Sequence, residues 1–288
     1  MSHISIFLEL TRLKKPIGFM LLFWPCLWGL TLAYDFQNKM DIYFFYFLLF
    51  LLGSILMRSA GCIVNDVVDR NYDKRVERTK NRPIASGKIS VKNSLVYVFL
   101  LCGLALLVLI NFNTITIVLA FVSMPLAFTY PLMKRVTYWP QLFLGITFNY
   151  GLILGWTSIH SEISLAPILL YMGAIFWTLG YDTIYGFQDI KDDEIIGVKS
   201  TSIKFKNNPK IFIFLSYFLF SISLILVGII MNFSKIYYIF LLAPLSHLFL
   251  YQVYNLDKNN NHSCLKIFKS NNLLGLLIFI CLLTEKII

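Results

Sequence analysis

Four residues with oxygen-bearing side chains recur at helical spacing in the stretch NDVVDRNYD, residues 65–73. At about 100° per residue, these side chains fall within about 100° of one another on a helix. They are Asn65, Asp66, Asp69 and Asp73. Mg²⁺ takes oxygen ligands and commonly bridges one or two carboxylates to substrate phosphates. The stretch therefore predicts half of a magnesium and diphosphate site. The alternative is a solvated charged loop that caps a membrane helix.

A second acidic stretch, YDTIYGFQDIKDDE, spans residues 181–194. On a continuous helix, Asp182, Asp189 and Asp193 would fall within about 40° of one another. Asp192 and Glu194 point elsewhere and are predicted to be solvated. Two columns of carboxylates on one membrane face would repel each other if nothing lay between them. A pair of Mg²⁺ ions with a diphosphate would remove this repulsion and would neutralise charge on a departing diphosphate.

Arg58 precedes Asn65 by seven residues, two helical turns deeper toward the bilayer. It lies on the same helix face as Asp69 to within about 20°. A charged residue at membrane depth is costly and usually faces a cavity or a partner. We expect Arg58 to anchor an anionic group of a second substrate, below the diphosphate. The alternatives are an ion pair with Asp66 and snorkelling to the interface.

Basic residues surround the acidic stretches. The loop KRVERTKNRPIASGKIS holds candidate phosphate-binding residues, which are Arg78, Lys80, Arg82 and Lys88. The segment YPLMKR brings Tyr130, Lys134 and Arg135 to the same membrane face, and one helical turn would align Tyr130 with Lys134. The alternative for both segments is an interfacial surface with the positive charge that any membrane protein carries.

The elements that position these residues are predicted to be membrane helices. Of the 288 residues, 58% are hydrophobic and only 14% are charged, against about 25% charged in soluble domains. Apolar runs of about 18 residues or more recur along the chain. They predict an all-α polytopic protein with a single transmembrane domain over residues 1–288 and nine spans, at about 17–34, 42–64, 94–112, 114–133, 138–158, 163–185, 209–231, 235–254 and 270–288.

Two smaller signals concern cysteine and glycine. The five cysteines are scattered without paired spacing, which favours neither disulfides nor zinc. Gly151 and Gly155 have the spacing GxxxG, which is typical of close helix packing within a chain.

The charges follow the membrane rather than a nucleic acid. With the N-terminus in the cytoplasm, the cytoplasmic segments hold 22 of the 25 basic residues, and only Lys39, Lys235 and Lys286 fall on the other side. This asymmetry predicts the orientation and accounts for most of the net charge of +10. Both acidic stretches then emerge on the cytoplasmic side. The first dozen residues have no signal or transit pattern, so we expect a bacterial inner membrane.

In these residues the chain resembles the UbiA superfamily of intramembrane aromatic prenyltransferases. NDVVDRNYD is similar to the first family motif, NDxxDxxxD, and QDIKDD is similar to the second, DxxxD. The strings KPIGFMLLFWP, LMRSAGC, KNRPIASG and GVKST resemble the bacterial branch that acts on 4-hydroxybenzoate. One departure is Lys191, where relatives often carry another acid. That position points away from the acidic stripe.

The resemblance implies a nine-helix bundle around a central cavity with a lateral opening to lipid. It implies transfer of a polyprenyl chain from its diphosphate to an aromatic ring, early in ubiquinone formation, with Mg²⁺ as cofactor. Asn65, Asp69, Asp73, Asp189 and Asp193 would hold Mg²⁺ and diphosphate, and Asp66 joins them as a candidate metal ligand. The expected substrate-binding residues, which contact the diphosphate or receive the hydroxybenzoate carboxylate, are Arg58, Tyr130, Lys134, Arg135 and Asp182.

Two other functions compete with this one. The first keeps prenyl transfer but changes the acceptor to a naphthoate, haem, homogentisate or chlorophyllide, as in other members of the superfamily. The second is a cation-coupled transporter whose intramembrane acids bind ions. Transporter sites usually lie near the bilayer midplane on broken helices, whereas both acidic stripes begin at helix ends. The expected partners are therefore a polyprenyl diphosphate, a small aromatic acid and the lipid bilayer.

Overall fold

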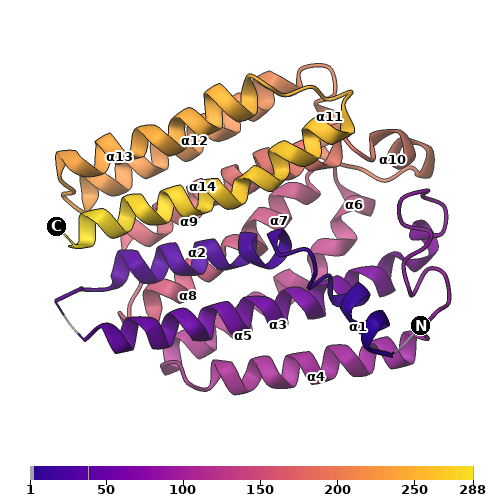
Figure 1. The fold of residues 1–288 in the computed structure, drawn as a ribbon, viewed down its shortest axis with the longest axis horizontal. Coiled ribbons are helices and arrows are strands. Elements are labelled where there is room, and N and C mark those ends of the chain that lie inside the picture. The colour runs from indigo at the N-terminus through magenta and orange to yellow at the C-terminus, as the bar shows by residue number, and fades with distance from the viewer. Residues whose placement is uncertain (1–2, 38, 288) are drawn as a thin grey trace.

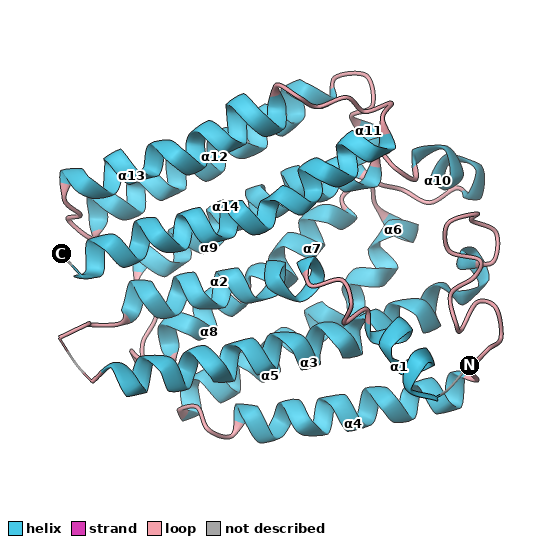
Figure 2. Cartoon of the chain, in the orientation of Figure 1, coloured by secondary structure: helices cyan, strands magenta, loops and turns pink. Residues whose placement is uncertain are grey.

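The computed structural model describes residues 3–37 and 39–287, and every regular element in these ranges is a helix (Figure 2). The all-α prediction is confirmed. The helices are α1 (His3–Thr11), α2 (Ile17–Ala33), α3 (Met40–Asp73), α4 (Val91–Leu109), α5 (Thr114–Thr129), η1 (Tyr130–Leu132), α6 (Met133–Val136), α7 (Pro140–Asn149), α8 (Gly151–Thr157), α9 (Leu165–Gly186), α10 (Ile190–Ile196), α11 (Thr201–Lys204), α12 (Pro209–Ile230), α13 (Lys235–Ser246), η2 (His247–Val253) and α14 (Asn261–Ile287).

Seven helical segments of the described chain are long and apolar enough to cross a membrane, as judged by length and composition. They are Met40–Asp73, Val91–Leu109, Thr114–Val136, Leu165–Gly186, Pro209–Ile230, Lys235–Val253 and Asn261–Ile287. Ile17–Ala33 is apolar but shorter. The protein is thus a multi-pass helical membrane protein. The count of nine spans is not confirmed, and the single domain stays a prediction.

The span predicted over 138–158 is divided at Tyr150 into α7 and α8. Asn149 explains the division. Its side-chain amide donates to the carbonyl of Gly145, four residues earlier, at 2.8 Å. Bonds of this kind are often found where helices bend. The same amide also reaches the carbonyl of Ala174 at 3.0 Å and Oγ1 of Thr178 at 2.7 Å, which ties α7 to α9.

The first acidic stretch lies where α3 extends beyond the bilayer. With 34 residues, α3 is about 51 Å long, against about 30 Å for the hydrocarbon core. No charged residue lies between Asp41 and Arg58, and charged or amide side chains become frequent from Asn65 onward. The surplus length therefore carries residues 65–73, still helical, past the membrane-crossing part.

The second acidic stretch does not form the single helix that the stripe required. α9 ends at Gly186, and Asp189 caps the start of α10 with φ −111°. Between them, Phe187, Gln188 and Asp189 each donate a backbone bond to a carbonyl three residues earlier. Ser202 packs against Gly186 in the space that a Cβ would need. The segment therefore turns between α9 and α10, and the 40° stripe prediction is wrong.

Glycines set the contact between α2 and α8. A Cβ on Gly29 would lie 2.0 Å from the carbonyl oxygen of Leu152, and a Cβ on Gly155 would lie 2.2 Å from that of Cys26. A Cβ on Gly151 would meet the Cys26 sulfur at 2.3 Å. These helices pack backbone to backbone, as the GxxxG spacing predicted.

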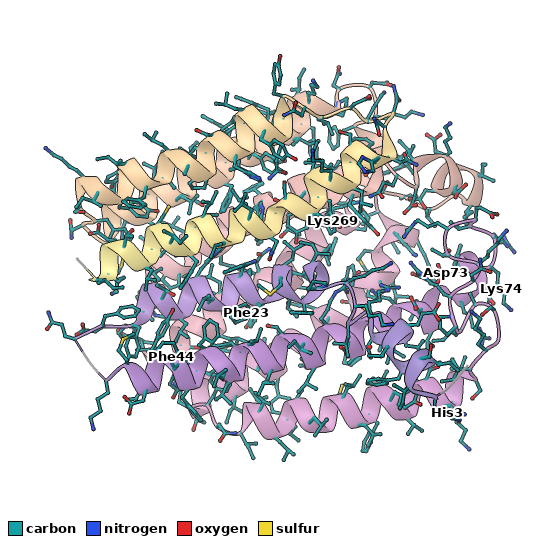
Figure 3. All side chains as sticks on the ribbon, viewed as in Figure 1. His3, Phe23, Phe44, Asp73, Lys74 and Lys269 are labelled. Carbon is teal, nitrogen blue, oxygen red and sulfur yellow. The ribbon has the colours of Figure 1, made fainter. Side chains whose placement is uncertain are left out.

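The bundle has a buried centre and a lipid-exposed rim. Within its membrane-crossing window, α9 is 61% buried, whereas α4 is only 11% buried and exposes large apolar side chains such as Phe99 and Leu107. Figure 1 shows α1, α6 and α10 at one end of the bundle and the end of α14 at the other. Asp73 and Lys74 lie at the α10 end (Figure 3). Both acidic stretches therefore share one end of the bundle.

Candidate active site

The carboxylates of the first stretch are buried against bases. Asp66, Asp69 and Asp73 are 2%, 8% and 7% exposed. Burial of carboxylates at this level requires charged or hydrogen-bonding partners. Each of the three has at least one basic partner within ion-pair distance. The stretch is thus part of a packed site, and the solvated-loop alternative does not hold.

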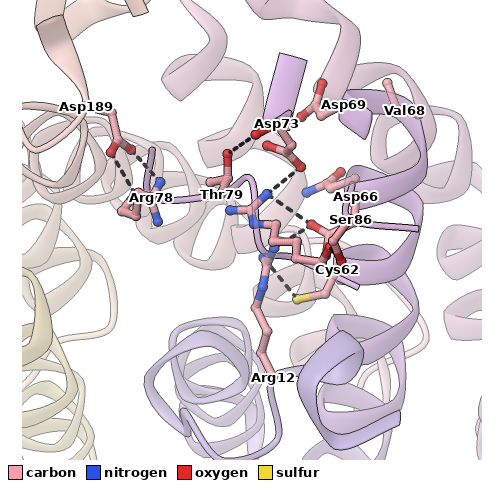
Figure 4. A network of polar contacts seen from close by, with 12 residues as sticks. Arg12, Cys62, Asp66, Val68, Asp69, Asp73, Arg78, Thr79, Ser86 and Asp189 are labelled. Carbon is pink, nitrogen blue, oxygen red and sulfur yellow. Dashed lines mark hydrogen bonds and ion pairs between the residues drawn. The ribbon is translucent and has the colours of Figure 1, made fainter. Parts of the chain in front are cut away.

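Asp66 joins two segments that are distant in sequence (Figure 4). Arg12, at the end of α1, donates from Nη2 to Oδ1 of Asp66 at 2.6 Å, and Arg82 donates from Nη1 to the same oxygen at 3.1 Å. Arg82 also reaches Oδ2 of Asp73 at 2.9 Å. Arg12 has φ +54°, which is uncommon outside glycine. Asp66 therefore holds α1 and the loop after α3 together.

Asp69 faces the segment that follows α5. Lys134 donates from Nζ to Oδ2 of Asp69 at 2.6 Å. Arg135 lies 3.7 Å from Oδ1, within ion-pair range but beyond hydrogen-bond range, and it donates instead to the carbonyl of Val68 at 3.0 Å. One oxygen of Asp69 is consequently buried without a hydrogen bond in the described structure.

The segment YPLMKR is helical rather than a loop. It forms η1 and α6, so Tyr130 and Lys134 both turn toward α3, as their spacing predicted. The Tyr130 hydroxyl accepts a bond from Nδ2 of Asn65 at 3.1 Å. The amide oxygen of Asn65 makes no hydrogen bond among the described residues. Tyr130, Lys134 and Arg135 thus contact the first acidic stretch, and their roles in substrate binding stay predictions.

Asp189 is bound by the loop that follows the first stretch. Arg78 donates from Nε and Nη2 to its two oxygens at 2.7 and 2.5 Å, and its Nη1 lies 3.4 Å from the hydroxyl of Tyr185. Asp193 lies one turn further along α10. Burial, together with the neighbouring carboxylate of Asp189, raises the pKa of Asp193 to about 6. The second stretch thus has its own basic partner.

Arg58 lies deeper and has a different environment. Its guanidinium stands over the ring of Phe148 at 5.3 Å from the centroid. Its Nε is buried without a hydrogen bond, and no ion pair of Arg58 occurs among the described residues. Asp66, the expected alternative partner, is bound by Arg12 and Arg82 instead. Arg58 interacts electrostatically with Asp182 on α9 and with Tyr130. These residues converge from four elements.

The donor set fits a cation shared with a phosphate rather than a cage made by the protein alone. In the described ranges, no three His, Cys, Asp or Glu side chains lie close enough to hold a metal ion. Mg²⁺ usually needs only one or two carboxylates when substrate phosphates complete its shell. The Asp69 oxygen that has no hydrogen bond and the carboxylates of Asp189 and Asp193, near the start of α10, would supply such ligands.

Some residues that contact the acidic stretches were not predicted from the sequence, and some predicted ones do not contact them. From the sequence, Arg12 is only one of the 22 basic residues on the cytoplasmic side. Its contact with Asp66 spans 54 positions, so no local pattern predicts it. Phe148 carried no sequence signal. In the loop after α3, Arg78 and Arg82 reach the acidic stretches, whereas Lys80 pairs with Glu77 and Lys88 bonds to the carbonyl of Asn81.

Comparison with known proteins places this geometry in a family. The UbiA prenyltransferase family matches residues 22–278. A Bos taurus protein named 4-hydroxybenzoate polyprenyltransferase, mitochondrial, is 46% identical over 277 residues, which are 95% of this chain and 73% of the relative.

Solved structures share the fold. A UbiA homologue from Aeropyrum pernix aligns with a TM-score of 0.72 at 21% identity and covers 94% of this chain and 96% of its own. A UbiA homologue from Archaeoglobus fulgidus, bound to DMAPP and Mg²⁺, aligns with a TM-score of 0.72 at 16% identity and covers 98% and 99%. By sequence and by fold, the chain belongs to the UbiA prenyltransferase family.

Proposed function

We propose that this protein transfers a polyprenyl group from polyprenyl diphosphate to 4-hydroxybenzoate, at the ring carbon ortho to the hydroxyl, and releases diphosphate. The observation that carries the proposal is the arrangement at one end of the bundle. Carboxylates paired with bases lie above Arg58, whose Nε is buried without a hydrogen bond and which has no ion pair among the described residues. The relative from Bos taurus, named for this reaction, supports it. Membership of the UbiA prenyltransferase family excludes the alternative function of a cation-coupled transporter.

The diphosphate end of the donor would lie between the two acidic stretches. Asn65, Asp69 and Asp73 would hold Mg²⁺ from α3, and Asp189 and Asp193 would do so from α10. Mg²⁺ would withdraw electrons from the diphosphate and weaken the allylic carbon–oxygen bond. The bases that pair with these acids, Lys134, Arg135, Arg78 and Arg82, would bind phosphate oxygens. The contacts of Asp66 with Arg12 and Arg82 argue for a role in positioning these bases rather than in binding metal.

The acceptor would lie deeper, against Arg58. The Arg58 guanidinium would receive the carboxylate of 4-hydroxybenzoate, with Tyr130 and Asp182 beside it. In this arrangement the phenol ring would lie below the diphosphate, and the ring and the allylic carbon would meet. A naphthoate or another aromatic acid remains the alternative acceptor, because the same anchor would bind its carboxylate.

The bond changes balance without a redox partner. The carbon–oxygen bond of the donor breaks, diphosphate leaves with the electron pair, and the ring carbon forms a new bond to the allylic carbon. The ring then loses one proton to a nearby carboxylate or to the released diphosphate. The aromatic and apolar surroundings of Arg58 would keep water away from the developing allylic cation, and the polyprenyl tail would remain in lipid.

We place the protein in a bacterial inner membrane, with its N-terminus and site loops in the cytoplasm and its product in ubiquinone formation. The distribution of Lys and Arg supports the orientation. A cysteine introduced at exposed Glu194 should react with an impermeant thiol reagent only in inverted vesicles. A cysteine at exposed Asn232, between α12 and α13, should react only in spheroplasts. The reverse labelling would contradict this orientation.

The reaction is tested with purified membranes, a labelled polyprenyl diphosphate and 4-hydroxybenzoate, with and without Mg²⁺. We expect a labelled lipid-soluble acid that is absent when EDTA is added. If intact protein forms this product only from another aromatic acceptor, the acceptor assignment is wrong. If it forms no prenylated product from any of them, prenyl transfer itself is wrong.

A further inference from the structure

Arg58 is confined on two sides by residues that the reaction does not otherwise use. On one side lies Gly18, in the first turn of α2, where a Cβ would be 3.0 Å from Nε and 3.6 Å from Nη2 of Arg58. On the other side, the ring of Phe148 in α7 lies under the guanidinium, 5.3 Å from its centre. The side chain of Arg58 therefore passes between α2 and α7.

The two neighbours restrict different parts of the guanidinium. The edge formed by Nε and Nη2 faces α2 at Gly18, and Nε is buried there without a hydrogen bond. The guanidinium carbon lies over the ring of Phe148, which is favourable because a cation is attracted to an aromatic face. Neither Nη atom makes an ion pair among the described residues, so we assign the edge formed by the two Nη atoms to the ligand.

Phe148 is mounted rigidly. The next residue, Asn149, is completely buried, and its amide bonds to Gly145, Ala174 and Thr178 across α7 and α9. Those bonds fix the backbone on which the Phe148 ring is carried. The clamp formed by Gly18 and Phe148 is thus a preorganised support for Arg58, of the kind that precise ligand positioning needs.

We propose that Gly18 and Phe148 determine the specificity for the acceptor, by fixing Arg58 so that its end-on Nη edge receives the carboxylate of a small planar aromatic acid. This inference rests on the proposed function and deepens it. Both residues act through Arg58 and are positioning residues. The required space at Gly18 also gives a reason for glycine at this helical position, where alanine would be the better helix former.

The first experiment enlarges residue 18 in steps. In Gly18→Ala the guanidinium must shift by a few tenths of an ångström, and in Gly18→Val by more. Misplacement by about 1 Å can cost about a hundredfold, so we expect the KM for 4-hydroxybenzoate to rise several-fold in the first variant and more in the second. The KM for the prenyl diphosphate should stay within about twofold, because its binding residues are untouched. Gly103→Ala and Gly103→Val, on α4 and away from the site, are matched controls, since a Cβ at Gly103 meets nothing within 4 Å.

The second experiment removes the aromatic face. Phe148→Leu should raise the KM for 4-hydroxybenzoate by about 2- to 30-fold, the range expected for loss of a cation–π contact. Phe148→Tyr should restore it, because the ring face is kept. Phe128→Leu, at an exposed position of α5, controls for loss of an aromatic ring. If Gly18→Val does not fold, this pair of Phe148 variants tests the clamp alone.

The decisive measurement compares 4-hydroxybenzoate with neutral 4-hydroxybenzamide, which has nearly the same shape. Binding is measured by calorimetry without donor or Mg²⁺, and kinetics are measured with both. Wild type should prefer the acid over the amide. In Gly18→Val and Phe148→Leu, the ratio of the affinities for acid and amide should fall toward one. If the variants keep the wild-type preference for the acid, or if their KM values for the acid and the amide rise equally, the proposed clamp is wrong. Failure of wild type to prenylate 4-hydroxybenzoate would instead count against the proposed function.

Discussion

Arg78 and Asp189 form a two-point ion pair between the two acidic stretches, with Nε to Oδ1 at 2.7 Å and Nη2 to Oδ2 at 2.5 Å. Arg78 belongs to the loop that follows α3, and Asp189 caps the start of α10. The loop of one stretch therefore closes onto the other. A bidentate geometry of this kind is specific to arginine, because lysine offers no planar fork.

Replacement of Arg78 is expected to separate the two stretches. Arg78→Gln and Arg78→Lys should both raise the KM for the prenyl diphosphate, about tenfold or more for Gln, since a charge-assisted bond is worth about 1.5–3 kcal/mol. Limited proteolysis should also cut the loop after α3 faster. Lys80→Gln serves as the control, because Lys80 forms its ion pair with Glu77 in the same loop. Equal effects of Lys80→Gln and Arg78→Gln would contradict a specific role for Arg78.

The carboxylates proposed as metal ligands should be indispensable. Asp69→Asn and Asp189→Asn are expected to abolish turnover, with the protein still monodisperse in detergent, because a neutral amide lacks the negative charge that a carboxylate brings to Mg²⁺. Asp192→Asn should retain activity, since Asp192 is predicted to point away from the site. The checks are product formation across a Mg²⁺ titration and gel filtration. Retained activity in either ligand variant means that the metal site is misplaced.

Arg58 should affect the acceptor rather than the donor. In Arg58→Ala, we expect the KM for 4-hydroxybenzoate to rise by about tenfold or more, since charge-assisted bonds to its carboxylate are lost. The KM for the prenyl diphosphate should change little. Arg70→Ala, an exposed arginine on the same helix, is the matched control. The opposite pattern, a larger change for the donor, would assign Arg58 to the diphosphate.

The Arg12–Asp66 pair should matter for stability. Arg12→Gln leaves a buried carboxylate with Arg82 as its remaining partner. The expected loss is about 3 kcal/mol, the lower end for breaking a buried ion pair, because Arg12 is partly exposed. Thermal unfolding of Arg12→Gln, Asp66→Asn and the double variant gives the coupling energy. Additive losses would show that the two residues act independently.

Packing between α2 and α8 gives a stability prediction outside the site. Gly29→Ala would push its Cβ against the Leu152 carbonyl and should cost roughly 1–3 kcal/mol, as for overpacked cores. In Gly103→Ala nothing lies within 4 Å of the new Cβ, so the helix should be unchanged or stabilised by up to about 1 kcal/mol. Thermal melts of both variants in one detergent make the comparison. A neutral Gly29→Ala would mean that the two helices can separate.

Features that depend on local periodicity could be predicted from the sequence. The apolar runs gave the long helices, and the spacing of Asn65, Asp69 and Asp73 gave one face of α3, because both follow from the helical repeat. The separation of Asp182 from Asp189 could not be predicted, because their spacing is helical although α9 ends between them, at Gly186. The partners of Asp66 were missed for a similar reason. Arg12 reaches it across 54 positions, and no local pattern encodes such a contact.

The pairing of acids with bases has a thermodynamic consequence. Lys134, Arg78 and Arg82 hold carboxylates, so an incoming cation and an incoming diphosphate each need partners that are already occupied. When the two ligands arrive together, the acids turn to the cation and the bases turn to the phosphates, and no charge is left alone. Each ligand should therefore raise the affinity for the other by the same factor. The site should therefore bind the cation or the diphosphate weakly when either is alone, and bind both tightly when they are present together.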